Sequence, residues 1–308
     1  MKNAMKERLH KLSTNGVWSA ILTPLTSDLS IDHGHLVQHA KFLLDQGCHG
    51  IGLFGTTGEA NSFSLKERMY GLESLLKNGI SPNCLMVGTG CCALPDTISL
   101  TRHAIENTVK RILLLPPFYY KNVTDDGLFR CFAEVIEKSG SNNIEVYLYH
   151  FPAMSQTPIS IDLIDKLCKT FPNIIAGIKD SSGKLDHSLA LASQFPDLAI
   201  FPGNEAYLLA ALEQGCAGTI TAMANANPRG IRKIFDGWLE EDPAVTSLQK
   251  NAFTIREVFS RHPLVSALKQ NAAWMSNEDS WLRIRPPLTI LDAKASSILR
   301  SDLKTLPV

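Results

Sequence analysis

The sequence alternates eight short apolar runs with longer segments of helical spacing, and this alternation constrains the fold more than any other feature. The eight candidate strands are residues 17–22, 50–54, 85–88, 111–115, 145–149, 174–179, 198–202 and 218–222. Between them, apolar residues recur at helical spacing, as at Leu128, Phe132 and Val135, with Gly, Pro, Ser or Asp at the boundaries. Eight strand–helix units predict an α/β fold, a (β/α)8 TIM barrel of parallel strands. A doubly wound open sheet is the alternative, and the number of units favours the barrel.

The strand pattern stops after about residue 238. Segments 244–261, 264–274 and 293–303 have helical spacing, which predicts a small helical C-terminal region packed outside the barrel. We therefore expect an N-terminal extension over residues 1–15, a catalytic barrel over 16–237 and a C-terminal helical domain over 238–308.

Charge and composition favour small-molecule chemistry. Thirty basic and thirty acidic residues cancel, and no long Lys/Arg block is present, so neither nucleic acid nor a membrane surface is expected as a partner. No stretch approaches the ~18 apolar residues of a membrane span, and the first residues lack the apolar core of a signal peptide, so we expect a cytoplasmic protein.

No metal site is predicted from the cysteine and histidine spacing. The seven cysteines are odd in number and lack zinc-site spacing, which indicates reduced thiols. His33, His35 and His39 are the nearest approach to a cluster. No acidic or cysteine partner completes a catalytic set, so these histidines are interpreted as a solvated helix face.

The sixth apolar run delivers Lys179 at its carboxyl end and then breaks at Asp-Ser-Ser-Gly. A lysine amine is almost wholly protonated in water, but a low-dielectric strand end disfavours the ammonium form and frees the lone pair to attack a carbonyl. Schiff-base chemistry on a keto compound is the first hypothesis. The alternative is a lysine that only marks a strand end, with its stem on apolar surface and its amine in water.

Other strand ends supply groups that suit the same chemistry. Thr56 and Thr57 lie between glycines after the second strand, and their hydroxyl and backbone N–H donors suit a carboxylate. Tyr149 ends the fifth strand and is a candidate general acid and base for an imine. The implied substrate is a 2-keto acid. Taken singly, the threonines also fit an ordinary capped turn, and the tyrosine a half-buried strand aromatic.

The run Gly50–Gly55 fits the glycine pattern of dinucleotide-binding proteins. Its glycines lie within the candidate strand rather than in the turn after it, which favours close packing inside a barrel over cofactor binding. An NAD-linked oxidoreductase and a non-catalytic keto-acid-binding protein remain the alternatives from other functional classes.

Taken together, five motifs resemble the dihydrodipicolinate synthase / N-acetylneuraminate lyase family of class I pyruvate-dependent aldolases. The motifs are the segments 55–59, 118–120, 149–152, 177–183 and 203–205. The match runs in order from about Gly16 to Ala226 and continues more loosely through the helical tail. The resemblance implies a (β/α)8 barrel with a C-terminal helical domain, a homotetramer built as a dimer of dimers, and no metal or organic cofactor.

The resemblance also implies the catalytic roles. Lys179 resembles the Schiff-base lysine, Tyr149 the proton-shuttling tyrosine and Thr56 its relay hydroxyl. Tyr120 resembles the tyrosine inserted from a neighbouring subunit, with Tyr119 as the substitute if the loop is shifted.

The same resemblance implies the substrate-binding residues. Thr57 resembles the residue that holds the pyruvyl carboxylate, Gly203 and Ile220 are expected to line the pocket, and Glu205 to meet a substrate hydroxyl. Met154 stands where dihydrodipicolinate synthases usually carry an arginine that grips the far carboxyl of the aldehyde. A methionine has no charge and no donor, so that recognition is absent at this position.

The replacement of the usual arginine by Met154 decides the expected activity. The chain is predicted to be a class I lyase or aldolase acting on pyruvate and a hydroxylated 2-keto acid, of the 2-keto-3-deoxy sugar acid or N-acetylneuraminate type. Its partners would be that small-molecule 2-keto acid and an aldehyde. The alternatives are 4-hydroxy-tetrahydrodipicolinate synthase and a sugar-acid dehydratase of the same family. His150, where asparagine is usual, is a second departure with no derived consequence.

Overall fold

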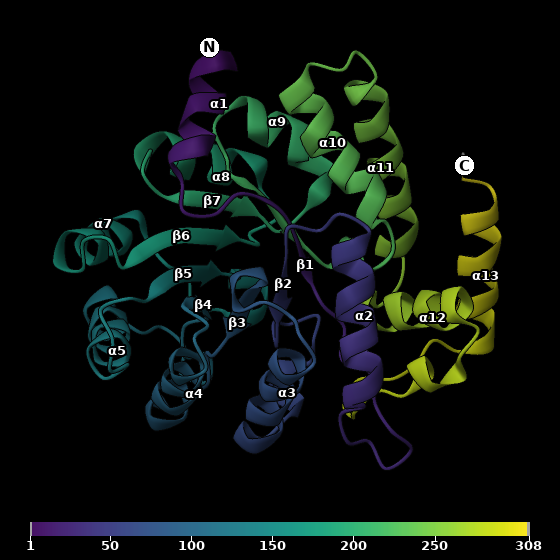
Figure 1. Ribbon diagram of the computed structural model, residues 1–308, viewed down its shortest axis with the longest axis horizontal. Coiled ribbons are helices and arrows are strands. Elements are labelled where there is room, and N and C mark those ends of the chain that lie inside the picture. Colours follow the sequence, from purple (N-terminus) through teal and green to yellow (C-terminus); the bar gives the residue numbers. More distant parts are fainter. Residues whose placement is uncertain (1, 307–308) are drawn as a thin grey trace.

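A computed structural model describes residues 2–306, and its centre is one sheet of eight parallel strands (Figure 1). The strands are β1 Gly16–Ala20, β2 Gly50–Leu53, β3 Leu85–Gly88, β4 Arg111–Leu114, β5 Glu145–His150, β6 Ile175–Asp180, β7 Ala199–Pro202 and β8 Gly218–Thr221. Their order is β7-β6-β5-β4-β3-β2-β1-β8. Neighbours in the sheet are neighbours in sequence except where β1 meets β8, as a closing barrel requires.

The sheet is a nearly closed barrel, which confirms the predicted fold. The ladder is continuous from β7 round to β8, and the last gap is bridged where the Ala217 N–H donates to the Ile200 carbonyl at 2.8 Å. Between β1 and β8, a Cβ on Gly218 would lie 1.9 Å from the Gly16 carbonyl oxygen. Closure at this seam therefore requires glycine.

Helices surround the barrel on the outside (Figure 1). The helices that follow strands β1 to β8 are α2 His33–Asp45, α3 Leu65–Lys77, α4 Leu94–Glu106, α5 Asp125–Glu137, α6 Pro152–Ser155, α7 Ile161–Thr170, α8 Leu185–Gln194, α9 Leu208–Glu213 and α10 Pro228–Glu240. Several begin at a side-chain cap: Asp32, Ser64, Thr124 and Ser160 each accept a hydrogen bond from a backbone N–H of the first turn.

The C-terminal helical region predicted from the sequence is present as α11 Val245–Ser260, α12 Leu264–Ser276 and α13 Ala293–Lys304. Figure 1 shows these helices on one side of the barrel, with α11 against α10 and α13 outermost. At the other end of the chain, α1 Lys2–Lys11 lies beside α9, and Leu9 is buried there. Within residues 2–306, none of the helices combines the length and apolar character needed to cross a membrane.

Of the three glycines of the Gly50–Gly55 run, Gly50 serves close packing, as expected. Gly50 lies in β2, where a Cβ would come within 2.3 Å of the Trp18 ring of β1. The run is thus part of the barrel wall rather than a turn that approaches a phosphate.

Candidate active site

Strand register brings Lys179 and Tyr149 together. They are paired residues of β6 and β5, and paired residues of parallel strands point to the same face of a sheet. Both side chains are 4% exposed, and Lys179 Nζ lies 4.3 Å from the centroid of the Tyr149 ring. Among the described residues, no hydrogen bond or ion pair engages this amine, although the side chain lines a cavity. An amine with this geometry is available to a ligand.

Thr56 reaches the same tyrosine across the barrel mouth. It follows β2, which β3 and β4 separate from β5, and its Oγ1 lies 3.3 Å from Tyr149 Oη. Thr57 is buried beside it and lines the cavity. Within the described part of the chain, the backbone N–H groups of Thr56 and Thr57 donate to no other residue. Both threonines line the cavity, and their two backbone N–H groups are left without an acceptor among the described residues.

A cavity of about 520 Å³ opens above these groups at the carboxyl ends of the strands. Seven of the nine site residues predicted from the sequence line it: Thr56, Thr57, Tyr149, Met154, Lys179, Gly203 and Ile220. The C-terminal helical region contributes a wall that the sequence did not predict: Arg256, Pro263, Leu264, Val265, Ser266 and Leu288. No strand-end pattern marks these residues, because they approach the barrel only through the tertiary packing of α11 and α12.

Tyr120 does not line the cavity of its own chain. It is 74% exposed, and Tyr119 is 75% exposed, with the two rings 5.4 Å apart in an edge-to-face arrangement. Both lie in the segment between β4 and α5, so neither phenol of this pair joins Tyr149 within one chain. The expectation that Tyr120 enters a neighbouring subunit's site stays a prediction.

Glu205 lies beneath the cavity rather than in its lining. Its carboxylate is buried, accepts a hydrogen bond from Thr221 Oγ1 at 2.5 Å and pairs with Arg256 Nη1 at 3.3 Å. Burial raises the pKa of Glu205, against the lowering effect of the Arg256 charge. The arginine itself lines the cavity, so Glu205 holds a cationic side chain at the wall. Its expected contact with a substrate hydroxyl stays a prediction.

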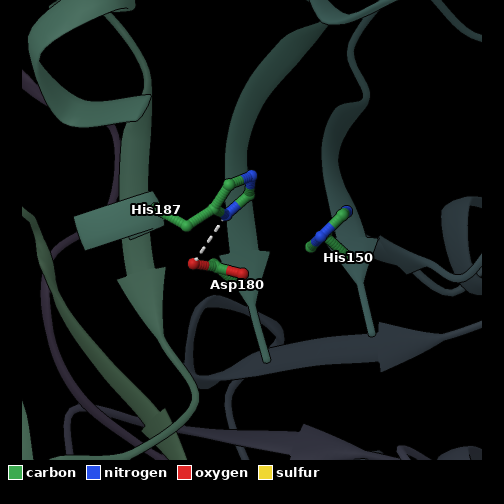
Figure 2. Close-up of side chains that lie close together, drawn as sticks. All are labelled: His150, Asp180 and His187. Atoms are coloured by element: carbon green, nitrogen blue, oxygen red, sulfur yellow. Dashed lines mark hydrogen bonds and ion pairs between the residues drawn. The ribbon is translucent and has the colours of Figure 1, made fainter. Parts of the chain in front are cut away.

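At the strand positions that directly follow Tyr149 and Lys179, His150 and Asp180 form a cluster with His187 of α8, and the ligand atoms of the three lie within 4.8 Å of one another (Figure 2). The His187 Nδ1 is 3.0 Å from Asp180 Oδ2, and the two imidazole rings stack at 4.7 Å. The Ile159 N–H donates to His150 Nδ1 at 3.1 Å, so that nitrogen carries the lone pair and the neutral ring carries its proton on Nε2. A protonated Nε2 cannot ligate a metal, which argues against a metal centre here.

The cluster instead anchors the strand end that carries the amine. Asp180 accepts hydrogen bonds from the Ser182 N–H, from His187 Nδ1 and from Ser188 Oγ. Burial would raise the pKa of Asp180, but these hydrogen bonds outweigh burial and lower it. The hydrogen bond to Asp180 raises the pKa of His187, whereas burial lowers the pKa of His150. The pairing thus favours a carboxylate and an imidazolium.

The histidines of α2 differ from their predicted environment. His39 is buried, its Nε2 lies 2.9 Å from Asn225 Oδ1, and burial lowers its pKa to about 4. The interpretation of a solvated helix face was therefore wrong for this residue, because α2 turns it toward the segment after β8. His35 remains partly exposed and pairs with Asp32 and Glu278.

A buried, unpaired amine beside a phenol and two hydroxyls, at the carboxyl ends of a parallel barrel, defines a class of enzyme that works on carbonyl compounds. The model of the dihydrodipicolinate synthetase family matches residues 13–306, and the chain belongs to this family. Members of the family are lyases and aldolases, so this protein is a class I aldolase or lyase.

Three relatives illustrate the similarity. A DapA-like lyase of Chloroflexus aurantiacus is 36% identical, over 93% of this chain and 95% of its own. The crystal structure of dihydrodipicolinate synthase from Agrobacterium tumefaciens superposes with a TM-score of 0.87 at 30% identity, over 95% of this chain and 99% of its own. A 2-keto-3-deoxygluconate aldolase of Sulfolobus solfataricus shares the fold, with a TM-score of 0.85 at 22% identity, over 94% of this chain and 96% of its own.

Proposed function

We propose that this enzyme cleaves or forms a carbon–carbon bond of a hydroxylated 2-keto acid through a Schiff base on Lys179. The observation that carries the proposal is the buried Lys179 amine, which has no partner among the described residues and lies against the Tyr149 ring in the cavity. The amine adds to the ketone, the carbinolamine loses water, and the resulting iminium accepts electrons from the adjacent bond.

The phenol of Tyr149 transfers the protons in this reaction. In the cleavage direction, Tyr149 takes the proton of the substrate hydroxyl as the carbon–carbon bond breaks, which releases an aldehyde and leaves an enamine on Lys179. Protonation of the enamine and hydrolysis of the imine release pyruvate and return the water lost earlier. Thr56, within hydrogen-bond distance of Tyr149, relays the proton.

The substrate carboxylate is assigned to the threonines. Thr57 would hold it with its hydroxyl, and the free N–H groups of Thr56 and Thr57 would add donors. Gly203 and Ile220 line the pocket. A Cβ on Gly203 would come within 2.3 Å of Ser181 Oγ, so the absence of a side chain keeps this part of the pocket open.

The rest of the cavity supports a substrate longer than pyruvate. At about 520 Å³ it has the volume of sites that take ligands of drug size. Its lining includes Arg256, which pairs with Glu205, and Met154, which is 63% exposed and offers no donor. A 2-keto-3-deoxy sugar acid or an N-acetylneuraminate-type acid fits this lining, and the Sulfolobus relative is by name an aldolase for a 2-keto-3-deoxy sugar acid.

Two alternatives use the same intermediate. The Agrobacterium relative is by name a dihydrodipicolinate synthase. The family resemblance implies that such synthases grip the far carboxyl of the aldehyde with an arginine, and here Met154 stands at that position. A dehydratase of the family would use the iminium to expel water instead of breaking a carbon–carbon bond. Both require Lys179.

We further propose a cytoplasmic homotetramer, a dimer of dimers, in which Tyr120 enters a neighbouring site. The exposed Tyr119–Tyr120 pair supports this assembly, since two large aromatic side chains in water favour burial against a partner. Light scattering after size exclusion would test it, with a monomer as the contradicting result.

A panel of 2-keto-3-deoxy sugar acids and N-acetylneuraminate, coupled to detection of released pyruvate, tests the activity. We expect turnover with at least one compound and none above background in Lys179→Ala. Condensation of pyruvate with an aldehyde that carries a carboxylate would favour the synthase, and loss of water from the sugar acid without release of pyruvate would favour the dehydratase. Turnover that survives Lys179→Ala would contradict the proposal.

A further inference from the structure

A buried ion pair links α12 to the turn that carries the two threonines, here called the threonine turn, residues 55–59. Lys269 Nζ lies 2.5 Å from Glu59 Oε1, with the two side chains 1% and 0% exposed. The same amine donates to the Arg283 carbonyl at 2.8 Å, and the Arg285 N–H donates to Glu59 Oε2 at 3.4 Å. The C-terminal region therefore closes around the last residue of the turn.

A buried ion pair of this kind contributes little net free energy to folding. Burying two charges costs their hydration free energy, and their mutual attraction offsets this cost only when the geometry is good. Well-packed apolar residues of similar size therefore often give the same stability. Burial lowers the pKa of Lys269, against the effect of the Glu59 carboxylate, which reflects the same desolvation. A pair of this kind has a clearer role in fixing one backbone arrangement.

The backbone at Glu59 needs such fixing. Its φ of 56° and ψ of 32° are left-handed, a conformation that a residue with a side chain adopts only when its surroundings hold it there. From this position the Glu59 N–H donates to the Thr56 carbonyl at 3.0 Å. Thr23 Oγ1 also donates to the Gly58 carbonyl at 2.8 Å. The hydrogen bond from the Glu59 N–H thus couples the backbone of Thr56 to the conformation of Glu59.

The bond that depends on this turn is sensitive to small movements. At 3.3 Å, the contact between Thr56 Oγ1 and Tyr149 Oη is longer than the roughly 2.5–3.0 Å of most hydroxyl hydrogen bonds, so a further small movement would break it. The same helix that carries Lys269 begins with Leu264 and Val265 in the cavity wall. One rigid element therefore sets both the wall of the cavity and the position of the turn.

We propose that Lys269 and Glu59 are positioning residues for the reaction: their buried ion pair locks the threonine turn so that Thr56 meets Tyr149 and Thr57 meets the substrate carboxylate. The proposal rests on the proposed function, which gives Thr56 and Thr57 their roles. Neither Lys269 nor Glu59 lines the cavity, so both act through the turn.

The test uses the double variant Glu59→Gln/Lys269→Met, because the single variant Lys269→Met leaves a buried carboxylate without its partner and would not fold well. The double variant carries no buried charge and keeps an oxygen for the Arg285 N–H. Arg261→Met is the matched control: it breaks an exposed ion pair with Asp302 in the same region, at 2.9 Å, far from the turn in sequence and contact. Thermal melting confirms that both variants are folded.

Two readouts decide the outcome. In the double variant, amide hydrogen exchange across residues 55–60 should become at least about 10-fold faster. The kcat/KM should fall about 10- to 100-fold through both a lower kcat and a higher KM for the keto acid. A purely structural role would reduce the amount of folded enzyme and leave KM unchanged. The control should match the wild-type enzyme in both readouts.

Unchanged exchange, or faster exchange with kcat/KM within about twofold of wild type, would overturn the proposal. Borohydride trapping with pyruvate separates this failure from failure of the proposed function. A pyruvyl adduct on Lys179 of the wild-type enzyme supports the function, whereas its absence refutes the function and with it the catalytic half of this inference. The exchange measurement then still reports whether the ion pair holds the turn.

Discussion

The hydrogen bond between Thr56 and Tyr149 yields a quantitative prediction, since it joins the two groups assigned to proton transfer. Tyr149→Phe removes the phenolic oxygen and leaves the ring packed over Lys179. General acid–base groups contribute about 10²- to 10⁴-fold, so kcat should fall by that factor. Thr56→Val keeps the phenol and removes only its partner at 3.3 Å. Its loss should be about 10- to 100-fold, the size of a hydrogen bond to a group that becomes charged.

Stability should respond far less than activity in these variants. The net contribution of one hydrogen bond is about 1 kcal/mol, which corresponds to about 2 °C in Tm for a chain of this size. Because the two groups act as one relay, the double variant should be close to Tyr149→Phe alone rather than the product of the two losses. Steady-state kinetics and thermal melts on the three variants provide the test. Multiplicative losses, or a Tyr149→Phe enzyme within threefold of wild type, would refute the relay.

Three further predictions follow from packing, recognition and titration. Gly177→Ala should destabilise the fold by about 3 kcal/mol, because its Cβ would lie 2.3 Å from a backbone carbonyl of β7, whereas Gly203→Ala meets mainly a rotatable hydroxyl and should melt near wild type. Met154→Arg should leave Tm within about 1 °C, since the residue is 63% exposed, and should raise kcat/KM for an aldehyde that carries a carboxylate. The hydrogen bond to Asp180 raises the pKa of His187 in the folded protein. The stability that this ion pair adds is therefore fully present below pH ~6.5, the ordinary pKa of histidine, and is lost as the pH rises through the folded-state pKa. The Tm advantage of the wild-type enzyme over His187→Gln should shrink accordingly as the pH is raised.

Local patterns in the sequence predict the barrel well. Each of the eight apolar runs corresponds to a strand within about two residues, because parallel barrel strands are buried on both faces and read as continuous apolar segments. Close packing is the correct interpretation of Gly50, which admits the Trp18 ring. Barrel topology then implies that Thr56, Tyr149 and Lys179 share one mouth, which the cavity confirms.

The features that the sequence did not predict depend on contacts between distant segments. Arg256 reaches the cavity from α11 because a buried glutamate 51 residues away holds it, and no spacing rule links the two. His39 is buried because α2 packs against the segment after β8, where its Nε2 meets Asn225 Oδ1, and no spacing rule links these two residues. Lys269 similarly meets Glu59 only through the fold of the C-terminal region. The role of Tyr120 depends on a second chain and stays a prediction.

The Schiff-base mechanism requires a covalent bond between the Lys179 amine and the ketone of the substrate. Borohydride reduction in the presence of pyruvate, followed by peptide mass spectrometry, detects this bond. We expect a reduced pyruvyl adduct on the peptide that contains Lys179, and no adduct in Lys179→Ala. An intact enzyme that turns over a keto acid without any such adduct, or an adduct on another lysine, would refute the mechanism.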